Sequence, residues 1–478
     1  MIGGCGTEKR GTVGHGVGAR AAEVGGIGAC GPEACGTEKR VTEGRGSNGR
    51  GPDAGGSEGQ LTRRAALGAI VATTALAATS RLALAAEGAR GTTGLKPMTS
   101  GAKPITPAER SARIAKLQAL MQQQKIAALL VDTGSTLDYF TGVRWHLSER
   151  VTAAVIPASG KTVIVTPFFE QPTIHEMLQI PAEIRTWQED ENPFELIAGV
   201  LNDHATPGGP LAVDGTARYY VLDAVTKALK SQRQVVPGHE LVRACRMFKS
   251  PAELALLQIA NDVTLAALRY VHAHLELGMR TADVSDLMDQ ATLALGAEPE
   301  FSMALLNEAS AFPHGSKAVQ TIRNGSVILM DCGCVVHGYQ SDISRTWVFG
   351  KPTVRQREVW NTVKRGQEIV LETAITGVPT GSIDEAVRVF YESKGWGKNY
   401  ALPGLSHRTG HGIGLDGHED PYLVRSDMTP LQAGMCFSDE PGIYIPGEFG
   451  IRLEDCWHMT EHGPKLFTPL ARSIDDPI

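Results

Sequence analysis

The 478-residue chain lacks runs of basic residues interleaved with aromatic side chains, and its formal net charge is −6. Proteins that follow a nucleic-acid backbone need a positively charged surface. We therefore expect no nucleic-acid partner. The chain also lacks a long, strongly apolar run before its globular part, because the alanine-rich stretch near residues 65–79 is short and only modestly apolar. No stable membrane insertion is expected.

The cysteines lack the spacing of a zinc site or of a disulfide framework. Cys30 and Cys35 have no second pair of cysteines or histidines nearby that would complete a zinc pattern. The body of the chain holds an odd number of cysteines, which excludes complete pairing: Cys245, Cys332, Cys334, Cys436 and Cys456. We interpret these as buried packing residues.

The first 86 residues have the composition of two different non-globular segments. Residues 1–60 are rich in glycine and have almost no apolar periodicity, so they are predicted to be disordered. Residues 61–86 contain Arg63-Arg64, an apolar stretch and Ala83-Leu84-Ala85, a pattern typical of a twin-arginine export signal. An ordinary alanine-rich helix is the alternative. The signal predicts export to the periplasm or the extracellular space.

Residues 104–245 have the alternating pattern of an α/β domain. Thr106 and Glu109 form a capping-box pattern that predicts a helix over residues 107–123, and residues 126–131 form a buried strand. Residues 151–156 and 162–166 are predicted to pair as strands. With 42% hydrophobic residues, the chain can hold two domains with cores.

Residues 246–478 repeat one order of elements, which predicts an α+β domain of two related halves. Each half has a long helix, a shorter helix and a hairpin with an acid on both arms. Capping patterns predict where the helices begin, and glycines or lysine where they end: Ser250/Glu253 to Gly278, Thr281 to Gly296, Thr353/Gln356 to Gly377, and Ser382/Glu385 to Lys394. A pseudo-twofold packing of the halves would bring the two acid pairs face to face.

The two hairpins predict a metal site. A turn near Val336 and His337 sets Asp331 roughly opposite Asp342, and Glu440 and Glu454 lie at equal distances from Gly447. Opposed like charges on neighbouring strands are unfavourable unless a cation lies between them. A glycine-rich loop at residues 407–419 adds imidazoles.

Two divalent ions would neutralise four carboxylates, whereas one would leave uncompensated charge. A single strand acid or loop histidine is usually a solvated residue, but the mirrored pattern favours the metal site.

Five phrases in these segments resemble the pita-bread metallopeptidases, the family of methionine aminopeptidase, Xaa-Pro aminopeptidase and prolidase. The phrases are Met330-Asp331-Cys332-Gly333, Ser341-Asp342-Ile343-Ser344-Arg345-Thr346, Gly410-His411-Gly412-Ile413-Gly414, Glu440-Pro441-Gly442-Ile443-Tyr444 and Ile451-Arg452-Leu453-Glu454-Asp455. The resemblance implies an α/β N-terminal creatinase-like domain followed by an α+β pita-bread domain with internal pseudo-twofold symmetry. It implies two divalent metal ions, usually Mn²⁺, with Co²⁺ or Zn²⁺ as alternatives. The implied metal ligands are Asp331, Asp342, His411, Glu440 and Glu454.

The resemblance also implies a catalytic shell. His314 would contact the substrate and the developing oxyanion, His418 would orient the carbonyl, and Glu440 would transfer a proton. Arg452 and Tyr444 would support them by hydrogen bonds. The alternatives are that the two histidines are structural and that Arg452 only pairs with an acid such as Asp331.

Other polar residues of these segments receive no catalytic role. His337, His407 and His458 are interpreted as structural or surface residues, and Glu419 and Asp420 as supporting or surface acids.

The expected activity is that of an Xaa-Pro aminopeptidase, a metallo-exopeptidase that hydrolyses N-terminal Xaa-Pro bonds of small proline-containing peptides. An Xaa-Pro dipeptidase (prolidase) is the alternative within the family. A non-catalytic pita-bread binding module is disfavoured by the complete ligand set, and creatinase by its metal-free chemistry. The family is commonly dimeric, so a homodimer is expected.

Overall fold

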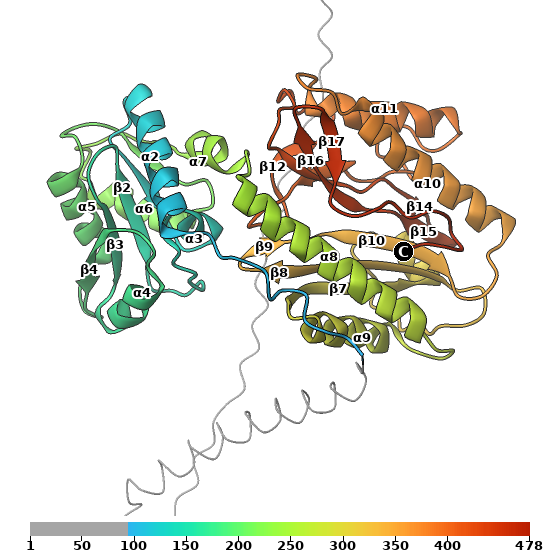
Figure 1. Cartoon of the computed structure of the whole chain (residues 1–478). Coiled ribbons are helices and arrows are strands. Elements are labelled where there is room, and N and C mark those ends of the chain that lie inside the picture. Colours follow the sequence, from blue (N-terminus) through green and yellow to red (C-terminus); the bar gives the residue numbers. More distant parts are fainter. Residues whose placement is uncertain (1–93) are drawn as a thin grey trace, which may run out of the picture. The chain divides into compact units, whose positions relative to one another are not determined.

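The computed structural model describes residues 94–478 (Figure 1). The segment predicted to be disordered, residues 1–60, and the predicted export signal, residues 61–86, lie outside the described residues.

The N-terminal domain is a mixed six-stranded sheet with helices on both faces. Its strands are β1 (Ala128–Val131), β2 (Ala153–Pro157), β3 (Thr162–Pro167), β4 (Ala182–Trp187), β5 (Leu211–Val213) and β6 (Val235–Pro237), in the order β4-β3-β2-β1-β5-β6. Its helices are α2 (Pro107–Gln123), α3 (Ser135–Thr141), α4 (Gln171–Met177), α5 (Pro193–His204), α6 (Tyr219–Ala228) and α7 (His239–Arg246), with a short 3₁₀ turn at Phe168–Glu170.

Successive side chains of β1 point to opposite faces of this sheet. Leu129 packs in one apolar cluster with Leu117 of α2, whereas Leu130 packs in another with Ile197 of α5 and Val225 of α6. The predicted helix over residues 107–123 is confirmed, and its N-cap hydroxyl on Thr106 accepts a hydrogen bond from the following turn. The predicted β2–β3 pair is also confirmed.

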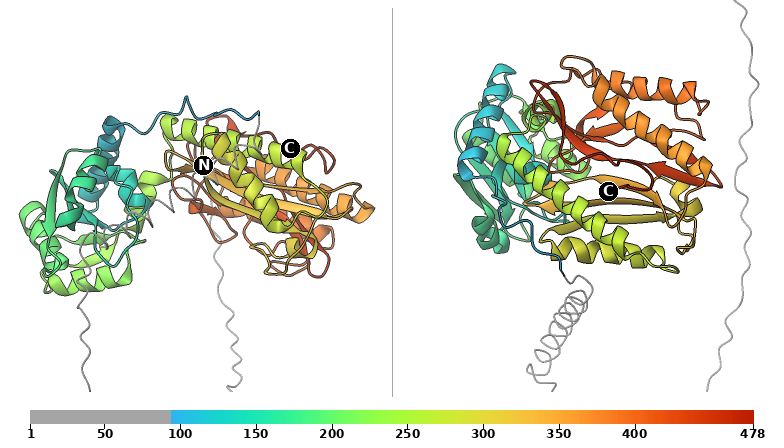
Figure 2. Two further views of the ribbon diagram at one scale, coloured as in Figure 1. Left: turned by 90° about the horizontal axis from the view of Figure 1, so that it is seen from below. Right: turned by 45° about the vertical axis from the view of Figure 1, so that its right-hand side comes forward.

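The C-terminal domain places strands between two pairs of helices (Figures 1 and 2). The helices are α8 (Pro251–His274), α9 (Thr281–Ala294), α10 (Val354–Thr373) and α11 (Thr380–Ser393). One sheet has the order β10-β8-β7 with β9 paired to β8: β7 (Glu298–Leu306), β8 (Val327–Val336), β9 (Tyr339–Gln340) and β10 (Ile343–Val348). A 3₁₀ turn at Asn307–Ala311 follows β7.

A second sheet has the order β12-β11-β13-β16-β17: β11 (Gly410–Gly412), β12 (Glu419–Leu423), β13 (Cys436–Asp439), β16 (Asp455–Thr460) and β17 (Gly463–Leu466). The hairpin of β14 (Gly442–Ile445) and β15 (Phe449–Arg452) connects β13 to β16.

Matching hydrogen bonds confirm the predicted internal repeat. Before α9, the amide of Gly278 donates to the carbonyl of Ile322 at 2.8 Å, and before α11 the amide of Gly377 donates to that of Leu431 at 2.8 Å. In each half a second hydrogen bond of 2.8 Å runs in the opposite direction: the amide of Ile322 donates to the carbonyl of Met279, and the amide of Leu431 donates to that of Val378. Both glycines have a left-handed backbone, with φ of 90° and 87°. The two halves therefore repeat one local structure.

One acid of each hairpin occupies the same position in the repeat. Gly325 and Gly434 have nearly equal φ angles, 85° and 90°, just before β8 and β13. Asp331 and Glu440 are each the sixth residue after these glycines. The two acids are thus equivalent positions of the duplicated unit.

The first hairpin corrects the predicted register. Its turn is confirmed at His337-Gly338, whose φ angles are 49° and 92°. The β8–β10 ladder pairs Asp331 with Ser344, so Asp342 lies diagonal to Asp331 rather than directly opposite it. The offset is two residues, and the period of a strand is also two, so both acids still point to one face.

The second hairpin confirms the predicted symmetry about its turn. One register, centred on Gly447, holds for the ladder β13–β16 and for the ladder β14–β15. Glu440 and Glu454 lie in the break between these ladders, at opposed positions. The break leaves their backbone free of ladder bonds, so that both carboxylates can turn toward one point.

The helix starts were predicted well except one. The capping boxes at Ser250 and Thr353 are both present. Helix α11 begins at Thr380, before the predicted Ser382, whose hydroxyl donates back to the carbonyl of Pro379 at 2.7 Å instead of capping the helix. All five body cysteines are buried and free, as predicted.

Within residues 94–478, α8 is the one helix whose length and apolar composition would allow it to cross a membrane. More than half of the apolar part of α8, 56%, is buried inside the protein, as in a core helix.

A fully buried ion pair fixes β10 against β16. Arg345 and Asp455 are both fully buried, and their charged atoms are 2.6 Å apart. Replacing Arg345 by Met leaves a buried carboxylate without its partner, so we expect the free energy of unfolding to fall by about 3–5 kcal/mol. Denaturant unfolding measures this loss.

The exposed pair Arg355–Glu448, with atoms 2.6 Å apart, serves as the control. Arg355→Ala should cost no more than about 1 kcal/mol, because water screens this pair. Equal losses for the two variants would contradict the importance of the buried pair.

Candidate metal centre

The five predicted ligand residues converge at one place, although they come from different strands. Asp331 lies on β8, Asp342 precedes β10, and His411 lies on β11; Glu440 follows β13 and Glu454 precedes β16. Their ligand atoms form overlapping groups. In the group Asp331–Asp342–Glu454 and in the group His411–Glu440–Glu454, all ligand atoms lie within 4.8 Å of one another. Glu454 belongs to both groups, so it is placed to bridge them.

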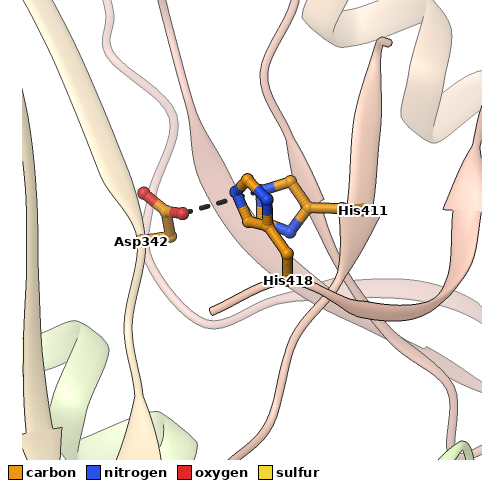
Figure 3. Close-up of side chains that lie close together, drawn as sticks. All are labelled: Asp342, His411 and His418. Atoms are coloured by element: carbon orange, nitrogen blue, oxygen red, sulfur yellow. Dashed lines mark ion pairs between the residues drawn. The ribbon is translucent and has the colours of Figure 1, made fainter. Parts of the chain in front are cut away.

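The imidazole of His411 faces the carboxylate of Asp342 (Figure 3). Its Nε2 atom lies 3.6 Å from Asp342 Oδ2 and 3.4 Å from Glu440 Oε1. On the other side of the ring, Nδ1 lies 3.1 Å from the carbonyl of Gly412. That contact places the ring proton on Nδ1 and leaves the Nε2 lone pair directed at the acids.

Two observations show that the residues fit divalent cations. First, Asp342 Oδ1 and Glu454 Oε1 are buried without a hydrogen-bond partner among the described residues. Second, burial and then the neighbouring acids raise the pKa of Asp342 and Glu454 well above their usual values, and burial raises the pKa of Glu440 to about 8. Crowded oxygen ligands of this kind suit hard divalent ions, which would restore the charged forms.

Ser344, which the sequence analysis did not single out, connects two of the ligands and Arg452 by hydrogen bonds. Its hydroxyl lies 2.9 Å from Asp331 Oδ1 and 2.7 Å from Glu454 Oε2, and it accepts a hydrogen bond of 2.8 Å from Arg452 Nε. With one hydrogen, the hydroxyl donates to one of the two acids at a time. The signal was present, because Ser344 follows Asp342 by two residues and thus shares its face of the strand.

Arg452 pairs with an acid and also organises its surroundings. The guanidinium contacts the Asp331 carboxylate, donates to the hydroxyl of Tyr444 at 3.0 Å and donates to the carbonyl of Pro313 at 3.3 Å. The last contact holds the loop that carries His314. Arg452 therefore forms the ion pair with Asp331 that was the alternative, and in addition it donates hydrogen bonds to Tyr444 and Pro313.

His407, which received no role from the sequence, lies beside the acids. Its Nε2 atom is 2.8 Å from the hydroxyl of Tyr444, and its Nδ1 atom is 3.8 Å from Glu440 Oε2. Burial, and then the charge of Arg452, lowers the pKa of His407 to about 3. A neutral imidazole in this position can donate or accept a hydrogen bond but adds no charge.

A cavity of about 620 Å³ opens onto the ligands. His314 and His418 line it together with all five ligands and Arg452, whereas Tyr444 is fully buried behind it and acts only through its hydrogen bonds. The remaining lining residues are Glu300, Phe301, Met303, Gln340, His407, Arg408, Asp416 and Gly417. This volume suits a small peptide.

The ring of His418 lies directly beside that of His411, with centroids 3.8 Å apart (Figure 3). Burial, and then the charge of Arg408, lowers the pKa of His418. His418 thus presents a neutral ring at the border between the ligands and the open cavity.

A buried cluster of carboxylates and an imidazole, opening onto a peptide-sized cavity, defines a metallohydrolase centre. The family model for metallopeptidase family M24 matches residues 255–461, and the model for the creatinase/prolidase N-terminal domain matches residues 113–248. The chain belongs to the M24 metallopeptidases, as the sequence predicted.

Similar proteins and a similar solved structure agree with this assignment. An uncharacterized peptidase of Schizosaccharomyces pombe is 32% identical over 75% of this chain and 81% of the relative. The Xaa-Pro dipeptidase of Lactobacillus helveticus is 28% identical over 75% of this chain and 97% of the relative. The crystal structure of dipeptidase PepE from Mycobacterium ulcerans superposes with a TM-score of 0.70 at 30% identity, over 77% of this chain and 97% of that one.

Removal of the Ser344 hydroxyl tests the ligand cluster. We expect Ser344→Ala to weaken divalent-ion binding about tenfold to a hundredfold, because two ligands lose the group that orients them. Glu454→Ala should remove binding altogether. Equilibrium dialysis with metal analysis measures both.

Glu461→Ala, which changes an exposed acid just past the end of β16, is the control and should bind like the unmodified protein. Unchanged binding in Glu454→Ala would refute the ligand cluster.

Proposed function

We propose that the chain is a dinuclear metal-dependent exopeptidase that hydrolyses the Xaa-Pro bond of dipeptides. The observation that carries the proposal is the convergence of four carboxylates and one imidazole on a peptide-sized cavity. The name of the Lactobacillus helveticus relative, an Xaa-Pro dipeptidase, supports the choice of proline and of dipeptides.

Two ions are proposed because the ligand atoms form overlapping groups, with Asp331 in one group, Glu440 in another, and Glu454 in both of these. Even with Arg452 beside Asp331, the four carboxylates carry more negative charge than one divalent ion neutralises in a buried place. Asp331 would help to hold one ion, His411 and Glu440 the other, and Asp342 and Glu454 would contribute to both. We propose Mn²⁺ as the native ion, with Co²⁺ and Zn²⁺ as alternatives. Bound ions of this kind lower the pKa of water and polarise a carbonyl.

Glu440 is the proposed proton carrier. Its carboxylate faces the cavity, and burial raises its pKa to about 8 in the ion-free protein. Glu440 would accept a proton from the attacking water and pass it to the departing prolyl nitrogen. His407 lies 3.8 Å from the second carboxylate oxygen of Glu440, while its Nδ1 atom is 2.7 Å from the carbonyl of Arg408.

His314 and His418 are the proposed carbonyl-side groups. Both line the cavity next to the ligands, and His418 is directly beside His411. A neutral imidazole can donate one hydrogen bond to the scissile carbonyl, where negative charge develops during attack. Removal of one such donor typically slows catalysis by about 10²–10³-fold.

Arg408 is the proposed site for the free carboxylate of a dipeptide. Its guanidinium lines the cavity and stacks on the ring of Tyr422, with 4.5 Å between Cζ and the centroid. Arg408 forms no ion pair with another residue of the described chain. A dipeptide brings a carboxylate within reach of the cut bond, whereas a longer peptide places an amide there.

Release of the first residue from longer peptides is the second candidate. A neighbouring cavity of about 550 Å³ shares Phe301, Met303 and His314 with the catalytic cavity. This space would receive residues beyond proline.

Comparison of an Xaa-Pro dipeptide with its C-terminal amide, in the presence of Mn²⁺, distinguishes the two candidates. We expect the dipeptide to be the better substrate. Arg408→Ala should raise KM for the dipeptide about tenfold to a hundredfold, the effect of one charge-assisted hydrogen bond, and should leave the amide almost unchanged.

Arg425→Ala, which removes an arginine paired with Glu385, is the control and should alter neither substrate. Equal cleavage of dipeptide and amide by both variants would support the aminopeptidase. Failure on every proline substrate would refute the proline assignment.

A further inference from the structure

His418 has no side-chain hydrogen bond to any residue in the described part of the chain, although it lines the catalytic cavity beside the ligands. Its ring contacts that of His411, and its position depends on the backbone turn between β11 and β12. The residue that follows it, Glu419, is buried and begins β12. Whatever holds Glu419 therefore also sets the position of His418.

Two cations from the junction between the domains hold Glu419. Lys249 Nζ lies 2.5 Å from Glu419 Oε1, and Arg246 Nη2 lies 2.5 Å from Glu419 Oε2. The side chains of Lys249 and Arg246 are only 1% and 9% exposed. Burial alone would raise the pKa of Glu419, but these two charges outweigh it and the pKa is lowered. Glu419 is thus a charged, doubly clamped carboxylate.

The same arginine binds the other end of the turn. Arg246 also donates to Asp416 Oδ2 at 2.8 Å, and Asp416 accepts a second bond of 2.7 Å from the hydroxyl of Ser135 on α3. The turn that contains His418 is therefore fixed on both sides, at Asp416 and at Glu419. Asp416 and His418 line both the catalytic cavity and a junction cavity of about 240 Å³, so the turn is the wall between them.

The clamp also contacts the ligand loop. Glu419 pairs with Gly412 across the β11–β12 ladder, next to His411. A Cβ atom at Gly414 would lie 2.6 Å from Glu419 Oε1, so this loop has no room for a side chain beside the carboxylate. Movement of Glu419 would disturb both histidines.

We propose that Arg246 and Lys249 are positioning residues, which place His418 against the substrate by clamping Glu419. The N-terminal domain and its junction with the catalytic domain thereby become part of the catalytic apparatus. The inference rests on the substrate-facing role proposed above for His418.

Glu419→Gln tests the clamp, because it keeps the shape of the side chain and removes its charge. We expect kcat for an Xaa-Pro dipeptide to fall about a hundredfold, the cost of a misplacement of about 1 Å. KM and metal content should stay close to those of the unmodified enzyme.

Glu253→Gln is the matched control. Glu253 is also a buried carboxylate at the junction, 3.3 Å from Arg113, but it has no contact with the turn of His418. Its substitution should lower thermal stability without a comparable loss of kcat. An equal loss of kcat in both variants would overturn the proposal.

A His418→Ala background separates positioning from general damage. If Glu419 acts through His418, Glu419→Gln should cause no further loss of kcat in that background. A further hundredfold loss would overturn the clamp. Native kcat in His418→Ala itself would instead refute the role of His418 in the proposed function, which is a different result.

A paired variant keeps the test valid if Glu419→Gln does not fold. Lys249→Met together with Glu419→Gln leaves no unpaired buried charge, because Arg246 retains Asp416. The same loss of kcat is expected in the folded double variant. Full activity there would contradict the proposal.

Discussion

The accumulation of four carboxylates in a buried place is the constraint on which the C-terminal domain depends. Taking each charge out of water costs several kcal/mol unless a partner compensates it. Arg452 compensates part of the charge at Asp331, and Ser344 supplies one hydrogen bond. Two of the carboxylate oxygens, Asp342 Oδ1 and Glu454 Oε1, have no hydrogen-bond partner in the described protein, and bound cations would satisfy them.

The duplicated architecture explains how one chain assembles such a site. Each half supplies a hairpin, and the equivalent acids Asp331 and Glu440 come at equal distances from a left-handed glycine. Three of the ligands, Asp342, Glu440 and Glu454, lie just outside the regular strands. Buried ion pairs behind the site, such as Arg345–Asp455, keep these irregular segments rigid. The fold thus holds the ligands in place before any ion arrives.

Much of this organisation was predictable because it has local signals. Capping boxes fixed the starts of α8 and α10, and turn residues such as Gly447 fixed the hairpins. The offset of Asp342 from Asp331 was missed because pairing register depends on contacts between strands, not on the turn alone. His407 was missed because a histidine in an irregular loop has no periodicity that indicates its direction.

The clamp on Glu419 could not be predicted for a related reason. Arg246 and Glu419 are far apart in sequence, and nothing local shows that a buried acid will meet two cations from the junction between the domains. Such long-range charge pairs are found only in the folded chain. They also give the N-terminal domain a physical connection to the catalytic cavity.

The most direct test of the account is crystallography of the Mn²⁺-loaded protein with anomalous scattering. Two anomalous peaks are predicted, one beside Asp331 and one beside His411 and Glu440, with Asp342 and Glu454 in contact with both. Peaks elsewhere, or none at these side chains, would contradict the central claim that the buried acids form a metal centre.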